Sequence, residues 1–208
     1  MRTVDTIAHF TPAKGGTVLP QKPPLTVDEQ KLNEVWNEHL RAEFKAHSAD
    51  ETVATMVANP RVHQVPVMIG GDGKEEVYQF YAKYFLPQIP PDTETVPISR
   101  TIGQGRLVDE IVIRFTHTIS MDWMLPGIAP TGKPVEVALV VVVQFDGDKV
   151  MHEHLYWDQT SVLVQLGLLE QKNLPVVGAE GARSLLDPSI GLNALIHRIK
   201  GRRSPKAS

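Results

Sequence analysis

The chain lacks cysteine altogether, since none of its 208 residues is a cysteine. This absence excludes a disulfide-stabilised scaffold, a zinc site built on thiolates and a cysteine nucleophile. An excess of one charge is missing too, because 21 lysine and arginine residues face 24 aspartate and glutamate residues, for a net charge of −3. Nucleic acids and anionic membranes are bound by strongly basic faces, so this balance argues against both as partners.

Long hydrophobic runs are absent as well. The longest run, residues 137–143, is far shorter than the roughly 18 apolar residues that a membrane-spanning helix needs. Residues 1–5 lack the apolar core of a secretory signal, so we expect a cytoplasmic protein. The glycine-rich stretch 70–73 lacks the Lys-Ser/Thr ending of a phosphate-binding loop, and Ser161 lacks the flanking motif of a hydrolase nucleophile.

What is present divides the chain into three parts. Residues 1–25 are rich in proline and glycine, which predicts an irregular N-terminal arm. Residues 26–170 carry regular hydrophobic patterns and form the predicted domain. Residues 171–208 are predicted to be a C-terminal extension with a short helix and a mobile basic tail.

The predicted domain changes from helices to strands along its length. Helical patterns and caps favour helices over residues 26–47, 51–58 and 74–85, with a short strand over 62–69 and a glycine turn at 70–73. Stretches rich in β-branched and aromatic residues then predict strands over 95–102, 107–121, 135–145 and 149–157, and a short helix follows at 159–166. This order predicts an α+β fold in which three N-terminal helices pack on a curved antiparallel sheet.

Several motifs within residues 30–170 resemble one known family. They are the helix at 73–81 after its glycine turn, the Phe-Thr-His-Thr run at 115–118, the Pro-Thr-Gly turn at 130–132 and the His-Glu-His strand at 152–159. Together they resemble the NTF2-like superfamily, and within it the SnoaL-like group of polyketide cyclase-like and carboxymethylenebutenolidase-like proteins. The resemblance implies a cone-shaped fold that encloses a pocket, and homodimers that pair through the β-sheet. It implies no single reaction, because such folds carry isomerases, dehydratases, cyclases, epoxide hydrolases and non-catalytic binders.

The last predicted strand carries the main candidate for catalysis. Its alternation places Glu153 on one face among methionine, leucine and tryptophan, where burial would raise the pKa of a carboxyl group. Such a group is suited to general acid–base catalysis. The structural alternative is that Glu153 pairs with an arginine such as Arg114. The opposite face carries His152 and His154, which offer half of a metal site as a rival interpretation.

Three further residues are candidate catalytic groups. His63 could move protons as a neutral imidazole or be a hydrogen-bonded structural histidine. His117, in the family's Thr-His motif, could orient a substrate oxygen or pin the loop that follows. Glu110 is a second pocket carboxylate or a solvated one. The resemblance argues against two family mechanisms: the epoxide-hydrolase relay falls on Glu110 and Val112, and the ketosteroid-isomerase base and tyrosine fall on Gln64 and Leu40.

The substrate-binding candidates are mostly large apolar side chains that could wall a small ring-shaped ligand. They are Trp36, Leu40, Gln64, Phe115, Trp123 and Trp157. Core packing is the alternative role for the aromatic members. The sequence thus predicts an enzyme that needs no cofactor or metal and acts on a small hydrophobic carbonyl or lactone-like compound by proton transfer. The competing prediction is a non-catalytic, dimeric small-molecule binder with the same pocket.

Overall fold

The computed structural model describes residues 24–203 of the chain. Six strands form one sheet in the order β2-β1-β6-β5-β4-β3. Their bounds are β1 Met56–Gln64, β2 Ile69–Asp72, β3 Glu94–Gly103, β4 Arg106–Thr116, β5 Pro134–Asp146 and β6 Lys149–Trp157. β1 and β6 run parallel and all other neighbours run antiparallel, so the predicted antiparallel sheet contains one parallel pair.

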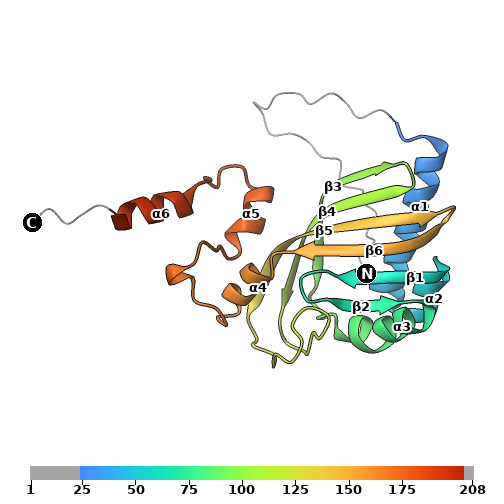
Figure 1. Cartoon of the computed structure of the whole chain (residues 1–208), viewed down its shortest axis with the longest axis horizontal. Coiled ribbons are helices and arrows are strands. Elements are labelled where there is room, and N and C mark those ends of the chain that lie inside the picture. The colour runs from blue at the N-terminus through green and yellow to red at the C-terminus, as the bar shows by residue number, and fades with distance from the viewer. Residues whose placement is uncertain (1–23, 204–208) are drawn as a thin grey trace, which may run out of the picture.

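The helices of the described residues come from two parts of the chain, three before β3 and three after β6 (Figure 1). They are α1 Val27–Arg41, α2 Ala49–Ala54, α3 Lys74–Gln79, α4 Gln159–Gln165, α5 Glu180–Leu186 and α6 Ala194–Arg203. π-helical turns, Ala42–Ala46 and Phe80–Phe85, extend α1 and α3. The α+β prediction of helices packed on a curved sheet is therefore confirmed. No helix within residues 24–203 is long and apolar enough to cross a membrane.

The region between α2 and α3 differs from its prediction. The helix expected over 51–58 ends at Ala54, because Met56 starts β1 and pairs with Val150 of β6. The strand expected over 62–69 ends at Gln64, and residues expected in a turn form β2 instead. Gly70 allows β2 to approach β1 closely, because a Cβ at this position would lie 1.9 Å from the carbonyl oxygen of Val62. The glycine that suggested a turn thus serves the close approach of two strands.

Helix α1 presents a different face to the core than its apolar pattern predicts. Thr26 caps the helix in a capping box with Glu29. The buried positions are Leu32, Trp36 and His39, and the same face continues to Glu43 in the π-helical turn. The apolar residues Val35, Trp36, Leu40 and Phe44 recur at a helical spacing that predicts a buried stripe. Only Trp36 of these four lies on the buried face. The tertiary contacts thus bury a histidine and a glutamate in place of apolar side chains.

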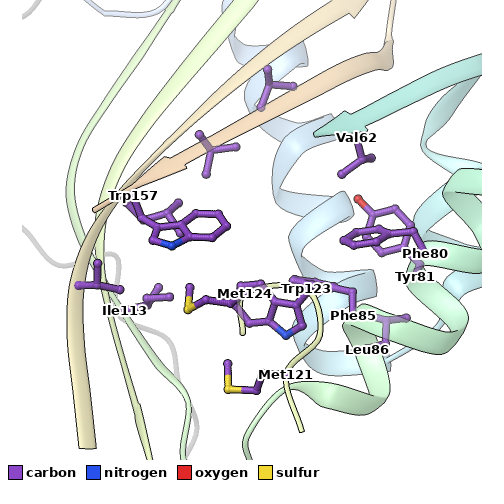
Figure 2. Packing of buried hydrophobic residues seen from close by; sticks show 14 of the residues in the cluster. Val62, Phe80, Tyr81, Phe85, Leu86, Ile113, Met121, Trp123, Met124 and Trp157 are labelled. Atoms are coloured by element: carbon purple, nitrogen blue, oxygen red, sulfur yellow. The ribbon is translucent and has the colours of Figure 1, made fainter. Parts of the chain in front are cut away.

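Aromatic side chains fill the space between the helices and the sheet (Figure 2). Phe80, Tyr81 and Phe85 come from the π-helical turn after α3 and are buried. Phe85 packs edge-on against Trp123 with ring centroids 5.2 Å apart, and Trp123 does the same against Trp157 at 6.4 Å. This packing holds the second π-helical turn against the loop that carries Trp123, and Phe85 and Trp123 form part of the cavity wall described below.

Strand β5 lies in the middle of the sheet between β4 and β6, as its continuous apolar sequence predicts. Arg183 of α5 bonds to Glu136 of β5 at 2.5 Å and so ties the C-terminal extension to the domain. The short helix predicted in the extension corresponds to α6. The predicted arm at 1–25 and the basic tail lie largely outside the described residues.

The close approach at Gly70 yields a stability prediction. Gly70→Ala should lower the free energy of unfolding by about 2–4 kcal/mol, because the added Cβ collides with the Val62 carbonyl and its φ of +151° disfavours alanine. Urea denaturation measures this loss. Gly103→Ala is the matched control, since its Cβ meets nothing closer than 3.8 Å. Equal stability of the two variants would contradict the packing described for β1 and β2.

Candidate functional site

A cavity of about 640 Å³ lies between α1, the second π-helical turn and the concave face of the sheet. Its wall is mainly apolar and includes Trp36, Leu40 and Trp123. Two groups of polar side chains stand out in the wall. One group contains Glu43, Tyr81 and Glu153, and the other contains Arg100 and Asp109, with Gln64 near the first. The other polar residues of the wall are Asn37, Arg41, Lys45, Thr93, Thr95 and Ser99. A mostly apolar cavity of this size with few polar groups is typical of a small-molecule site.

The first polar group is centred on the imidazole of His39, which is fully buried. His39 Nε2 lies 3.1 Å from Glu153 Oε1 and 3.2 Å from Glu43 Oε1. The Tyr81 hydroxyl donates to Glu153 Oε1 at 3.2 Å. On the other side of the ring, His39 Nδ1 lies 2.6 Å from the Thr55 hydroxyl oxygen. We call His39, Glu43, Tyr81 and Glu153 the acid cluster.

The partners of His39 determine its protonation. The Thr55 hydroxyl donates its own hydrogen to the backbone carbonyl of Thr52 at 2.7 Å, so it accepts from His39 Nδ1. The partners of Nε2 are two carboxylates, which only accept when ionised, and the Tyr81 hydroxyl at 3.3 Å, whose own hydrogen goes to Glu153. Both ring nitrogens must therefore donate, and His39 is an imidazolium held between Glu43 and Glu153.

Electrostatics give the same result as the hydrogen bonds. Burial lowers the pKa of His39, but the Glu153 and Glu43 carboxylates outweigh burial and raise that pKa to about 10. Burial raises the pKa of Glu43, although His39 acts against this increase. Burial and the two nearby carboxylates raise the pKa of the Tyr81 hydroxyl well above its usual value. The cluster thus retains protons at neutral pH in a largely dry environment.

Local structure explains how the acid cluster is brought together. His39 and Glu43 are four residues apart, which places both on the inner face where α1 becomes π-helical. Tyr81 lies in the other π-helical turn, and Glu153 lies on β6 with its side chain on the concave face. Wide π-helical turns are frequent at functional sites because they redirect side chains.

The second polar group links α1 to the far strands of the sheet. Arg100 of β3 donates two hydrogen bonds to Asp109 of β4, at 2.6 and 2.7 Å, and Trp36 Nε1 donates to the same carboxylate at 2.7 Å. Arg100 also bonds to the side-chain oxygens of Asn33 and Asn37 on α1 at 2.7 Å each. These contacts occupy Asp109 fully and make it a structural anchor of the cavity wall.

Of the residues proposed from sequence, five line this cavity. Glu153 does so as the candidate catalytic carboxylate, and Trp36, Leu40, Gln64 and Trp123 do so as candidate binding residues. The alternative pairing of Glu153 with Arg114 is not what the structure has: Arg114 bonds to Glu94 and Glu136.

The remaining five proposed residues are not in the cavity wall. His63 packs edge-on against His154, with ring centroids 5.9 Å apart, on the opposite face of the sheet. Glu110 accepts from Ser99 at 3.0 Å on that same outer face, and the cavity carboxylate is its neighbour Asp109. His117 is buried beneath the following loop, where it contacts Thr131.

Phe115 and Trp157 belong to the hydrophobic core. The Trp157 indole donates to Gln159 Oε1 at 2.6 Å, which orients the ring beside α4. Core packing, which the sequence left as the alternative role for the aromatic residues, is therefore the role that the structure gives these two.

His39, Glu43 and Tyr81 are the members of the acid cluster that the sequence did not single out as site residues. A signal was present for two of them, because residues 32, 36, 39 and 43 follow the spacing of one helical face. Polar residues at the last two positions of such a face mark a buried polar site. Tyr81 carried no such signal, since an aromatic residue at an inward position fits an ordinary core.

The same cluster offers the donors for a metal ion. Within residues 24–203, His39, Glu43 and Glu153 form the one group of three ligand-type side chains whose donor atoms lie within 4.8 Å of one another. His152 and His154 stack on the outer face without a third ligand at that distance. The imidazolium proton of His39 supplies positive charge at the same place, so a proton suffices to hold the two carboxylates together.

The fold and the cavity define an α+β protein whose helices and curved sheet enclose a mostly apolar cavity. A family model for SnoaL-like polyketide cyclases matches residues 29–166, and the chain belongs to that family. The match contains every residue of the acid cluster. No functionally curated protein matches the sequence.

Solved structures support the fold at low sequence identity. A protein of Jannaschia sp. CCS1 assigned as a SnoaL-like polyketide cyclase is 18% identical, with a TM-score of 0.57 over 72% of this chain and 100% of the other. AclR of Streptomyces galilaeus, assigned as a hydroxylase, is 17% identical with a TM-score of 0.53 over 69% and 89%. TsrD of Streptomyces laurentii is 14% identical with a TM-score of 0.53 over 69% and 100%.

The acid cluster predicts how stability depends on pH. Because the pKa of His39 is raised from 6.5 to about 10, its contribution to stability is complete below pH 6.5 and is lost as the pH rises through about 10. The free energy of unfolding, measured by urea denaturation, should therefore fall between these two pH values.

Replacing the cation tests the origin of this loss. His39→Gln should cost about 3–5 kcal/mol at neutral pH, because two buried carboxylates lose their charged partner. It should also remove most of the loss above pH 6.5. Glu43→Gln is the matched variant, and it should shift the loss to lower pH by weakening the hold on the His39 proton. A wild-type profile that stays flat up to pH 10 would contradict the imidazolium assignment.

Proposed function

We propose that this protein is an enzyme that catalyses proton transfer on a small, mostly apolar carbonyl or lactone-like compound, without a cofactor. The observation that carries the proposal is the position of Glu153, which lines the cavity and is bonded within the acid cluster. The family model names polyketide cyclases, which supports an enzyme of the cyclase, isomerase or dehydratase type. We also keep a cytoplasmic location as part of this proposal.

The geometry assigns a role to each member of the cluster. The hydrogen bonds to Glu153 from Tyr81 and His39 both fall on Oε1, which leaves Oε2 for a proton of the bound compound. As Oε2 takes that proton, the hydrogen bonds on Oε1 hold the carboxyl group in place. Glu43, whose pKa burial raises, contacts the same His39 nitrogen as Glu153 and is the second carboxyl group of the cluster.

Exchange of hydrogen for deuterium tests this role without knowledge of the natural substrate. In D₂O, the wild-type protein should speed the exchange of the acidic α-protons of 2-tetralone, an apolar bicyclic ketone, as followed by NMR. Glu153→Gln keeps the shape of the side chain but cannot take the proton. We expect it to slow the catalysed exchange by about 10²–10⁴-fold.

Glu75→Gln is the matched control, because Glu75 is an exposed carboxylate on α3 that contacts Gln79. It should exchange at the wild-type rate. Exchange that the protein does not accelerate, or that Glu153→Gln leaves intact, would remove the catalytic proposal and favour the alternative of a non-catalytic binder with the same cavity.

We further propose that two copies pair through the outer face of the sheet. This face carries half-buried valines on neighbouring strands, among them Val108 of β4 and Val140 and Val142 of β5. Cavity and pairing surface would then lie on opposite faces, so the dimer would leave the cavity unchanged.

A single charge on the outer face tests this pairing. Val140→Glu should convert a dimer into a monomer, because a carboxylate at the centre of the contact, directly opposite Glu110 of β4, would be buried without a partner. Light scattering during size-exclusion chromatography gives the mass of both proteins, and circular dichroism confirms that the variant is folded. A monomeric wild-type protein would refute the proposed dimer.

A further inference from the structure

Two side chains of the cavity wall carry a buried polar atom without a hydrogen-bond partner within residues 24–203, Gln64 through Oε1 and Thr93 through Oγ1. Of the two, Gln64 lies on the strand that adjoins Glu153. Gln64 ends β1, is only 1% exposed and lines the cavity. Its Oε1 atom is buried and has no hydrogen-bond partner within residues 24–203. A buried amide left without a partner destabilises a fold, and such groups are rare in native proteins. Its position in a cavity wall suggests that a bound molecule supplies the missing hydrogen bond.

The register of the sheet places Gln64 within one row of cavity residues. Gln64 pairs with Leu155, Leu155 with Val141, Val141 with Asp109, and Asp109 with Arg100. All five line the cavity, so this row crosses its floor from β1 to β3. Leu155 and Val141 form an apolar surface between a free amide at one end and the occupied Arg100–Asp109 pair at the other. A flat apolar molecule fits over this floor with its polar end at Gln64.

The catalytic carboxylate is close to that polar end. Glu153 pairs with Val62, which places it on the same face as Gln64 and two residues away along the adjoining strand. Ordinary strand spacings put the two Cα atoms about 8 Å apart. Two side chains that extend over this distance into one cavity contact groups on the same ring or on adjoining rings of a ligand.

We infer that Gln64 binds a hydroxyl group of the substrate, and that the substrate is a mostly apolar, ring-containing hydroxy-carbonyl compound. A hydroxyl both donates and accepts, so it pairs with the side-chain amide in either orientation of that amide. A carbonyl or ether oxygen can only accept and leaves Oε1 unpaired. The position of the reacting carbon rests on the function proposed for Glu153, whereas the hydroxyl contact is a property of the cavity alone.

Binding of matched two-ring probes tests the contact without any reaction. The probes are 2-naphthol and 2-methoxynaphthalene, which differ in the hydroxyl hydrogen, with naphthalene as the apolar reference. Quenching of Trp36 and Trp123, which line the cavity, or calorimetry gives the dissociation constants. Wild-type protein should bind 2-naphthol at least about tenfold more tightly than either of the other two probes.

The variant Gln64→Leu removes the amide and keeps nearly the same volume. It should bind the three probes with similar affinity, retain wild-type affinity for naphthalene, and unfold at a higher temperature than wild type, because the unpaired buried amide is gone. Gln64→Met serves the same purpose if the leucine variant does not fold. Gln30→Leu is the matched control that should preserve the preference for 2-naphthol, because Gln30 is an exposed residue of α1 outside the cavity wall.

Three results would overturn the inference: equal binding of 2-naphthol and 2-methoxynaphthalene to wild type, a preference that survives in Gln64→Leu, or no binding of any probe. These results are independent of the exchange experiment on Glu153. If the protein does not catalyse exchange but prefers 2-naphthol through Gln64, the proposed catalysis is refuted and the hydroxyl site is retained. If the protein catalyses exchange through Glu153 but shows no such preference, the hydroxyl site is refuted and the proposed catalysis is retained.

Discussion

The interior of this protein depends on a positive charge placed between two buried carboxylates. Glu43 and Glu153 approach the same nitrogen of His39 from a helix and from a strand, and without that cation their repulsion would be strong in a region with little water. The contact between α1 and β6 is therefore electrostatic where most helix–sheet contacts are apolar. The Thr55 hydroxyl completes the arrangement, because it requires the other ring nitrogen to donate.

The same arrangement separates the cavity into parts with different chemistry. At one end lies the acid cluster, with an imidazolium between two carboxylates. At the other end Arg100, Asp109 and Trp36 satisfy one another and fix α1 against β3 and β4. Between them the floor is apolar, and Gln64 Oε1 and Thr93 Oγ1 are the buried polar atoms of the wall that have no partner within residues 24–203. A small molecule would be oriented by this contrast between occupied and open polar groups.

Sequence patterns predicted much of the fold because they report the periodicity of burial. The strands from 94 onward, the helix after the glycine turn and the central place of β5 all follow from β-branched runs and apolar spacing. The same reasoning was wrong for residues 55–72, where a parallel pairing with β6 and a close approach at Gly70 override local preference. At the site, alternation on β6 separated Glu153 from His152 and His154 without deciding which face lines the cavity. On β4 the sequence named Glu110 as a pocket carboxylate, whereas its neighbour Asp109 lines the cavity.

By itself, the amino-acid sequence determined the α+β class and the separation of Glu153 from His152 and His154 onto opposite faces of the last strand, since both depend on local spacing along the chain, and its motifs gave the family resemblance. Only the tertiary structure decided which of these faces lines the cavity and which groups surround Glu153. The helix with His39 and Glu43, the turn with Tyr81 and the strand with Glu153 are far apart along the chain, and the pKa values of His39, Glu43 and Tyr81 depend on the burial and charge that this packing imposes. Interactions of this kind exist only after the chain has folded, because they arise from distances that no sequence spacing encodes.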